Sequence, residues 1–517
     1  MLNRIAAAAL VLATLTARAE SKDALSGESL GLYSAADYRV VDGRCTDCPA
    51  PRQALWYFEN DLVAVPREAR SGRSSLVWIG SPEIAEHVTL SQDGLRLVDA
   101  SGAETPFTLA PRLATNRSYY DASTAAFLQG RSLRVRGRHA EDGAFVGRVL
   151  WPEDYRLEPG AAPRAKAAET VDGLVTADPG AEAGRFATRV LWERDPKGAG
   201  HWEGKSALAL VLSGAQGDDD EALGGHFAVA TGRVGSNGAW ADWTVDNFYN
   251  LDSVSEKGII AARTPMDAYL TDLNSGQAYY RPNYVLALIL RDERAARRYQ
   301  DAIDGVYDRL YRHDLPYHHS ASNCSGISMD ALRGIGWEIP RRGPTSYAKA
   351  TAAFFYRTAT TRSVAKGEST FDYLVEEQTR LLPRVAFDAA GSDVQRLLRG
   401  ERAPVTEYER LLKEDVEAVV FVRVPQIPSS RAQGSFPVAS FAEYQARVPA
   451  DLSKWKIVSV APRPFPEALR EGPAPAGHRS KAVPAAASTG AALVGVLWFA
   501  GRGVRRLWRR LFVRSGS

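Results

Sequence analysis

Residues 226–248 read HFAVATGRVGSNGAWADWTVDNF. Apolar and β-branched residues dominate 227–234 and 240–248, and the segment GSNG at 235–238 separates these runs with residues that favour turns. This pattern predicts an antiparallel hairpin whose first strand begins beside His226, directly after two glycines.

Strands and helices are expected on both sides of this hairpin. Residues 207–212 and 284–290 are continuous apolar runs, as in buried strands. Residues 292–312 carry apolar side chains at helical spacing, and a second helix is expected near Cys324, where Asn323 or Ser325 could cap it. The fold class is therefore α+β, with an antiparallel sheet packed on helices.

The N-terminal third is instead expected to be rich in short β-strands. Short strand-like runs at 74–79, 88–90, 95–98 and 133–135 are broken by Gly, Asp and Ser. A Pro- and Ala-rich stretch at 158–168 then separates this β-rich part from the hairpin region.

Both ends of the chain suggest export and a membrane anchor. The apolar N-terminal segment ends in Ala17-Arg18-Ala19, which suits a signal peptidase. Residues 483–501 carry no charge and are long enough to cross a bilayer, and arginines follow at once, which marks the cytoplasmic side. The alternatives are an amphipathic tail lying on the membrane surface and a C-terminal sorting tag.

These features together give the expected organisation. It is a signal peptide (1–19), a β-rich domain (20–159), a sheet-and-helix domain (170–345), an α/β extension (346–470), a linker (471–482), a transmembrane helix (483–501) and an arginine-rich cytoplasmic tail (502–517). The folded body is expected in the periplasm of a bacterial envelope, held to the inner membrane by a single span.

Composition excludes several other classes of protein. The content of 45% hydrophobic and 24% charged residues is that of a globular protein rather than a disordered one. The net charge is +3, but eight arginines lie in the two end segments, so the body itself is slightly acidic. Nucleic acid is therefore not an expected partner.

The three cysteines divide into a pair and a single residue. Cys45 and Cys48 form a C-x-x-C motif, which favours a disulfide in an exported protein. A zinc site would need a second pair of ligands, so we expect no metal and no cofactor. Cys324 is left without a partner, and its small polar neighbours suggest an accessible thiol.

Cys324 is the expected nucleophile. A helix N-terminus beside its sulfur should lower the thiol pKa and offer donors for an oxyanion. A thiol of this kind needs a histidine as base, and His226 at the start of its strand is the best candidate. His318 and His319, a few residues before the cysteine, are the rival bases.

A third group should hold the imidazole in place. The second strand of the hairpin returns beside the first, so Asp242, Asp246 or Asn247 could reach His226. Among these three residues the prediction is Asp242.

This order of residues resembles the circularly permuted papain-like cysteine hydrolases, the group of permuted cell-wall peptidases and lecithin-retinol-acyltransferase-like proteins. The resemblance is carried by GHFAV at 225–229 and SNCSG at 322–326, and it covers about a third of the chain. It also extends to poorly characterised, membrane-associated periplasmic domains. It implies Cys324 as nucleophile, His226 as base and a polar orienting residue, here Asp242. The long insertion between His226 and Cys324 departs from the pattern.

The sequence therefore favours a membrane-anchored periplasmic cysteine hydrolase. Its expected substrate is an amide or ester of the cell envelope, namely a peptidoglycan peptide, a protein or a lipid-linked acyl group, cleaved through an acyl-thioenzyme. The alternative is a non-catalytic scaffold or binding protein with a degenerate papain-like domain, in which Cys324 is buried and far from His226.

Overall fold

The computed structural model describes residues 25–59, 61–69, 75–113, 119–158, 162–166, 169–177, 185–195, 201–216, 224–251, 261–344, 346–429, 434–447 and 463–470. The predicted signal peptide, linker, transmembrane helix and arginine-rich tail all lie outside these ranges. None of the helices within the ranges is both long and apolar enough to cross a membrane.

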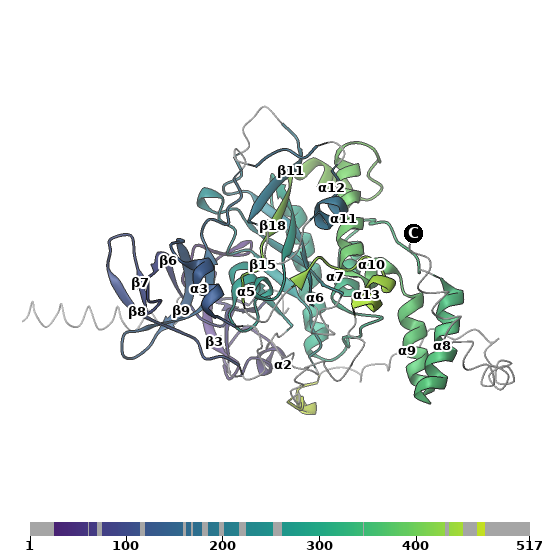
Figure 1. The fold of residues 1–517 in the computed structure, drawn as a ribbon, viewed down its shortest axis with the longest axis horizontal. Coiled ribbons are helices and arrows are strands. Elements are labelled where there is room, and N and C mark those ends of the chain that lie inside the picture. Colours follow the sequence, from purple (N-terminus) through teal and green to yellow (C-terminus); the bar gives the residue numbers. More distant parts are fainter. Residues whose placement is uncertain are drawn as a thin grey trace, which may run out of the picture.

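A seven-stranded antiparallel sheet lies at the centre of the molecule (Figure 1). Its strands, in spatial order, are β11 (Ala187–Glu193), β18 (Val416–Val424), β17 (Asn283–Leu290), β12 (Ser206–Ser213), β14 (His226–Arg233), β15 (Thr244–Asn247) and β16 (Ala262–Pro265). The chain is therefore a mixed α+β protein, as expected. Strand β18, from the predicted C-terminal extension, lies inside this sheet between β11 and β17.

The predicted hairpin is confirmed, with a shorter second strand. Antiparallel pairing joins Val229 to Asp246 and Thr231 to Thr244. Strand β15 starts at Thr244 because residues 234–243 form a wide turn, in which η2 (Ser236–Gly238) includes Asn237 with a φ of 53°. The residues nearest the end of β15 are thus the ones that return toward the start of β14.

Both faces of the sheet are covered, which explains why its central strands are apolar at every position. Leu208, Leu210 and Leu212 pack with the helices on one face, and the alternate residues Ala207, Ala209 and Val211 pack on the other. The first face carries α6 (Arg294–Tyr311), α7 (Cys324–Gly334), α11 (Pro383–Leu398) and α12 (Glu407–Asp415).

The remaining helices surround this body. Helices α8 (Tyr347–Thr361) and α9 (Val364–Val375) form a hairpin that projects from it at the lower right of Figure 1. Helix α9 is separated from α10 (Gln378–Leu381) by Glu376 and Glu377, which are extended. The others are α2 (Arg52–Trp56), α3 (Ala122–Leu128), α4 (Val171–Thr176), α5 (Met266–Thr271) and α13 (Phe441–Arg447), with short turns η1 (Ala35–Asp37), η3 (Gln277–Tyr279) and η5 (Glu467–Leu469).

The N-terminal part is β-rich, as expected. It contains a closed barrel of β6 (Glu83–Leu90), β7 (Arg96–Val98), β8 (Glu104–Leu109), β9 (Leu133–His139) and β10 (Phe145–Pro152), a sheet of β3 (Tyr38–Asp42), β4 (Leu62–Pro66) and β5 (Val77–Trp78), and a ribbon of β1 (Ser29–Leu30) and β2 (Tyr33–Ser34). The barrel shares one apolar core with the second face of the central sheet, through residues such as Trp151 and Trp240. The two parts of the chain are thus packed together.

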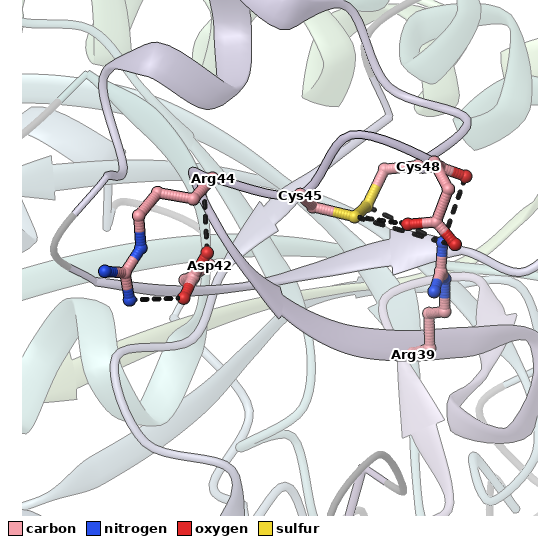
Figure 2. Close-up of a disulfide and its surroundings, with 6 residues drawn as sticks. Arg39, Asp42, Arg44, Cys45 and Cys48 are labelled. Atoms are coloured by element: carbon pink, nitrogen blue, oxygen red, sulfur yellow. Dashed lines mark hydrogen bonds and ion pairs between the residues drawn. A yellow bond between two sulfur atoms is a disulfide. The ribbon is translucent and has the colours of Figure 1, made fainter.

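The predicted disulfide joins Cys45 and Cys48 in the loop between β3 and α2 (Figure 2). One guanidinium nitrogen of Arg39 lies 4.0 Å from the sulfur of Cys45 and 3.7 Å from that of Cys48. Asp47 completes the one group of described residues whose atoms are close enough to ligate a metal. Because its two sulfurs are bonded to each other, this group offers no thiolate.

Candidate active site

Cys324 lies at the start of α7, as the sequence predicted. Asn323 caps the helix, and its side-chain oxygen accepts a hydrogen bond from the Gly326 N–H at 2.8 Å. The amide nitrogen of the same side chain donates to the carbonyls of His319 (2.9 Å) and Leu381 (3.3 Å). The cap therefore fixes the nucleophile loop to both the preceding turn and α10.

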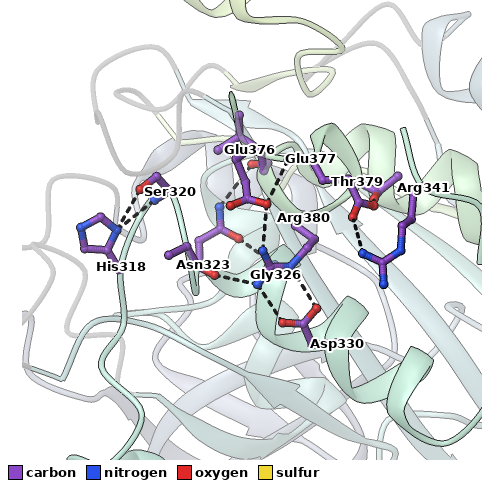
Figure 3. Close-up of polar contacts among 12 residues, drawn as sticks. His318, Ser320, Asn323, Gly326, Asp330, Arg341, Glu376, Glu377, Thr379 and Arg380 are labelled. Carbon is purple, nitrogen blue, oxygen red and sulfur yellow. Dashed lines mark hydrogen bonds and ion pairs between the residues drawn. The ribbon is translucent and has the colours of Figure 1, made fainter. Parts of the chain in front are cut away.

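Arg380 on α10 holds the same loop from outside (Figure 3). Its guanidinium donates to the carbonyl of Ala321 at 2.8 Å and also pairs with Asp330 and Glu376, each at 2.8 Å. No local pattern predicts this contact, because Arg380 is far along the chain from Cys324. The break between α9 and α10 is what brings Arg380 to the loop.

The Cys324 side chain is 6% exposed, which corrects the expectation of an accessible thiol. Burial is also the largest effect on its acidity and raises the pKa of the thiol. The backbone N–H groups of Phe227 and Ser325 and the positive charge of Arg281 act in the opposite direction. The expected lowering of the pKa by the helix N-terminus is thus wrong for this structure, because desolvation outweighs the nearby donors.

His226 is the first residue of β14 and is 4% exposed. Its Nε2 lies 2.7 Å from the side-chain oxygen of Asn247, and its ring stacks on Tyr249 with the centroids 4.7 Å apart. When Nε2 donates to this amide oxygen, a neutral imidazole has its lone pair on Nδ1. The thiol of Cys324 faces the N–H of Phe227, the residue that follows His226. The fold thus brings the predicted nucleophile and base to the same end of β14.

Gly225 allows the chain to enter the strand at this point. Its φ is +89°, a conformation that other residues rarely adopt. A Cβ atom there would lie 2.7 Å from the carbonyl oxygen of Ser213 and 2.8 Å from Cβ of Pro437. Residues around Pro437 therefore pack directly against the start of β14, next to the imidazole.

Asn247, rather than Asp242, orients the imidazole. Asn247 is buried at the end of β15, and its N–H donates to the hydroxyl of Tyr307 on α6 at 2.9 Å. Asp242 lies at the turn end of the hairpin, roughly 20 Å along the strand from His226. There it pairs with Arg134 of the barrel at 2.5 Å. This position corrects the choice of Asp242 as the third residue of the site.

The other candidates have different partners. Asp246 faces Arg263, with a nitrogen–oxygen distance of 3.1 Å, and burial raises its pKa to about 6. The Nδ1 atom of His318 lies 3.0 Å from the hydroxyl of Ser320 (Figure 3), and the ring of His319 packs edge-on against Tyr317. Neither histidine replaces His226 beside Asn247.

No protein-family model, curated protein or solved structure matches this chain.

Three residues of the site were not predicted from the sequence. Tyr249 stacks on His226, and its hydroxyl accepts a hydrogen bond from Gln277 at 3.4 Å. The side-chain oxygen of Gln277 accepts hydrogen bonds from Arg281 in turn. Gln277 and Arg281 belong to the insertion between His226 and Cys324, so this insertion supplies part of the site.

A cavity of about 920 Å³ lies between the N-terminal part and chain segments next to strands β15 and β16 at the edge of the sheet. Asn250 and Leu251, which follow Tyr249 in the chain, line one side of it, and Trp56 and Tyr57 line another. Cys324 and His226 are not among its lining residues. The cavity is therefore adjacent to the site through the chain that leaves β15, without containing the thiol.

Proposed function

We propose that the chain is a cysteine hydrolase of the permuted papain-like type, with Cys324 as nucleophile, His226 as base and Asn247 as orienting residue. The observation that carries this proposal is the buried His226–Asn247 hydrogen bond at the same strand end as the Cys324 thiol. Nucleophile, base and orienting amide then occupy the roles that thiol hydrolysis requires.

The catalytic cycle follows from these roles. Nδ1 of His226 takes the thiol proton as sulfur attacks the substrate carbonyl, and Asn247 stabilises the imidazolium that forms. Backbone N–H groups in the first turn of α7 are donors for the oxyanion. The imidazolium then protonates the leaving amine or alcohol as the carbon–heteroatom bond breaks. Water, deprotonated by His226, hydrolyses the thioester and restores the thiol.

The proposed setting is the periplasm, with the body anchored to the inner membrane by residues 483–501. The proposed substrate is an envelope amide or ester, in the order peptidoglycan peptide, protein and lipid-linked acyl group. In this scheme the N-terminal part, whose barrel packs on the second face of the sheet, presents or gates the substrate.

A second candidate is a non-catalytic envelope scaffold or binding protein. The observation that favours it is the burial of Cys324, which is 6% exposed. The position of His226 argues against it, because a buried amide aligns its ring at the strand end where the Cys324 thiol meets the N–H of Phe227.

The experiment is acylation of the purified chain by p-nitrophenyl acetate, followed by intact-protein mass spectrometry. The hydrolase predicts that an acetyl adduct forms on Cys324 with a burst of p-nitrophenol, and that the adduct then decays by hydrolysis to acetate. Cys324→Ala must abolish both the adduct and the burst while keeping the same thermal unfolding midpoint. An unmodified thiol in the folded wild-type chain would instead support the scaffold.

A further inference from the structure

Arg281 is a buried arginine in the turn between η3 and β17, and its side chain is 2% exposed. Its Nε donates to the side-chain oxygen of Gln277 at 3.0 Å, and one terminal nitrogen donates to the same oxygen. The other terminal nitrogen, Nη1, is buried and makes no hydrogen bond to the described residues. The guanidinium is therefore held by a neutral acceptor, and the N–H groups of Nη1 remain able to donate hydrogen bonds to a ligand.

This arrangement differs from that of the other buried arginines in the described part of the chain. Each of the others pairs with a carboxylate: Arg134 and Arg136 with Asp267, Arg263 with Asp246 and Asp304, and Arg384 with Asp172. No described carboxylate forms an ion pair with Arg281. Burying a charge without a counter-ion is unfavourable, so the binding of an anion beside Arg281 would recover free energy.

The guanidinium lies close enough to the nucleophile to act on it. Its charge opposes the burial that raises the pKa of the Cys324 thiol, and it has the same effect on the phenol of Tyr269. Gln277, which holds Arg281, also donates to Tyr249 at 3.4 Å, and Tyr249 stacks on the base His226. Arg281 is thus connected to both halves of the proposed catalytic pair.

Close packing fixes the position of Arg281. A Cβ atom on Gly434 of β19 (Gly434–Ser435) would lie 2.5 Å from the Cα of Arg281. Strand β19 in turn pairs with β13 (Ala215–Gln216). The backbone and Cβ of Arg281 are therefore held against β19, which limits the positions that its side chain can take.

We propose that Arg281 binds a carboxylate of the substrate, next to the carbonyl that Cys324 attacks. The inference rests on the proposed hydrolase function and narrows its substrate to acyl compounds with a nearby carboxylate, such as peptides with a free terminal or side-chain carboxyl group. A guanidinium with an unused N–H edge suits a planar carboxylate. The bound carboxylate supplies a counter-ion that no described residue provides.

Two alkylating reagents test this without knowledge of the substrate. Iodoacetate carries a carboxylate and iodoacetamide does not, while both alkylate a thiolate by displacing iodide. The chain has three cysteines, and two are joined as a disulfide, so modification under non-reducing conditions reports on Cys324. The quantity measured is the ratio of the iodoacetate rate to the iodoacetamide rate.

The ratio should be higher in the wild-type chain than in Arg281→Gln by about tenfold or more, the effect of one charge-assisted hydrogen bond. Arg281→Lys should give an intermediate ratio, because it keeps the charge without the fork. Arg298→Gln, at an exposed arginine of α6, is the matched control and should keep the wild-type ratio.

Each other result overturns the inference in a distinguishable way. Equal ratios in the wild-type and Arg281→Gln chains, with Cys324 reactive in both, reject the carboxylate site and leave the hydrolase standing. A thiol that reacts with neither reagent rejects the hydrolase and the inference with it. If Arg281→Gln does not fold, the wild-type chain decides, because acetate must slow iodoacetate labelling more than chloride does at equal ionic strength. Equal effects of the two salts reject the carboxylate site.

Discussion

Replacing Asn247 by alanine should lower the rate at which Cys324 is acylated while leaving the chain folded. The substitution removes the acceptor 2.7 Å from Nε2 of His226, and the ring is 4% exposed, so water cannot easily take its place. Leaving a buried donor unsatisfied costs about 1–3 kcal/mol. If that cost falls on the transition state, in which the ring is positively charged, the rate falls roughly 5- to 150-fold.

The assay is the burst rate of p-nitrophenol release from p-nitrophenyl acetate, measured across a range of pH. Asn247→Asp keeps an acceptor oxygen and should recover most of the rate, because a carboxylate also stabilises the imidazolium. The backbone N–H of Asn247 still donates to Tyr307 in both variants, so the chain should stay folded, with Asn247→Ala losing at most about 1–3 kcal/mol of unfolding free energy. If Asn247→Ala acylates as fast as wild type while Cys324→Ala is inactive, the assignment of Asn247 as orienting residue is refuted.

Three further variants separate structural from catalytic residues. Gly225→Ala should destabilise the chain by about 1–3 kcal/mol and slow acylation, because a Cβ would lie 2.7 Å from the carbonyl oxygen of Ser213 and displace His226. Wild-type stability and acylation rate in this variant would contradict this. Asp242→Asn should lower the unfolding free energy by about 1–3 kcal/mol, because its ion pairs with Arg134 and Arg136 of the barrel are lost, and it should leave acylation of the folded protein unchanged. A large loss of acylation rate would instead place Asp242 in the site. The double variant Cys45→Ser/Cys48→Ser should lose about 2 kcal/mol of unfolding free energy, as expected for so short a disulfide loop. Denaturant titration under oxidising conditions measures this loss, and equal stability would show that the bridge does not constrain the unfolded chain.

Local patterns in the sequence were sufficient for the elements that carry the site. The turn at 235–238 predicted the hairpin, and the polar segment around Cys324 predicted a helix start. Antiparallel pairing also predicts the correct orienting residue, because the last residues of the second strand of a hairpin lie beside the first residues of its first strand. Asp242 lies at the turn end of the hairpin, so it cannot reach His226, whereas Asn247 lies at the end of the second strand and contacts the ring.

The remaining features depend on contacts between distant parts of the chain. Cys324 is buried, although its immediate neighbours are small and polar, because α7 packs against β14. Likewise, Arg380 holds the nucleophile loop only because the chain breaks between α9 and α10. Arg281 reaches the site from an insertion whose sequence has no recognisable pattern. Hydrophobic periodicity carries no information on such contacts.

The most direct test of the central claim is the pH dependence of iodoacetamide labelling at Cys324, in the wild-type chain and in His226→Ala. Burial raises the thiol pKa, so without its base the buried thiol should react only above the ordinary cysteine pKa of about 8.5. The account predicts that the wild-type profile lies at lower pH and that labelling at neutral pH is about tenfold or more faster than in the variant. Superimposable profiles would show that His226 does not act on the thiol, and the proposed catalytic pair would be wrong.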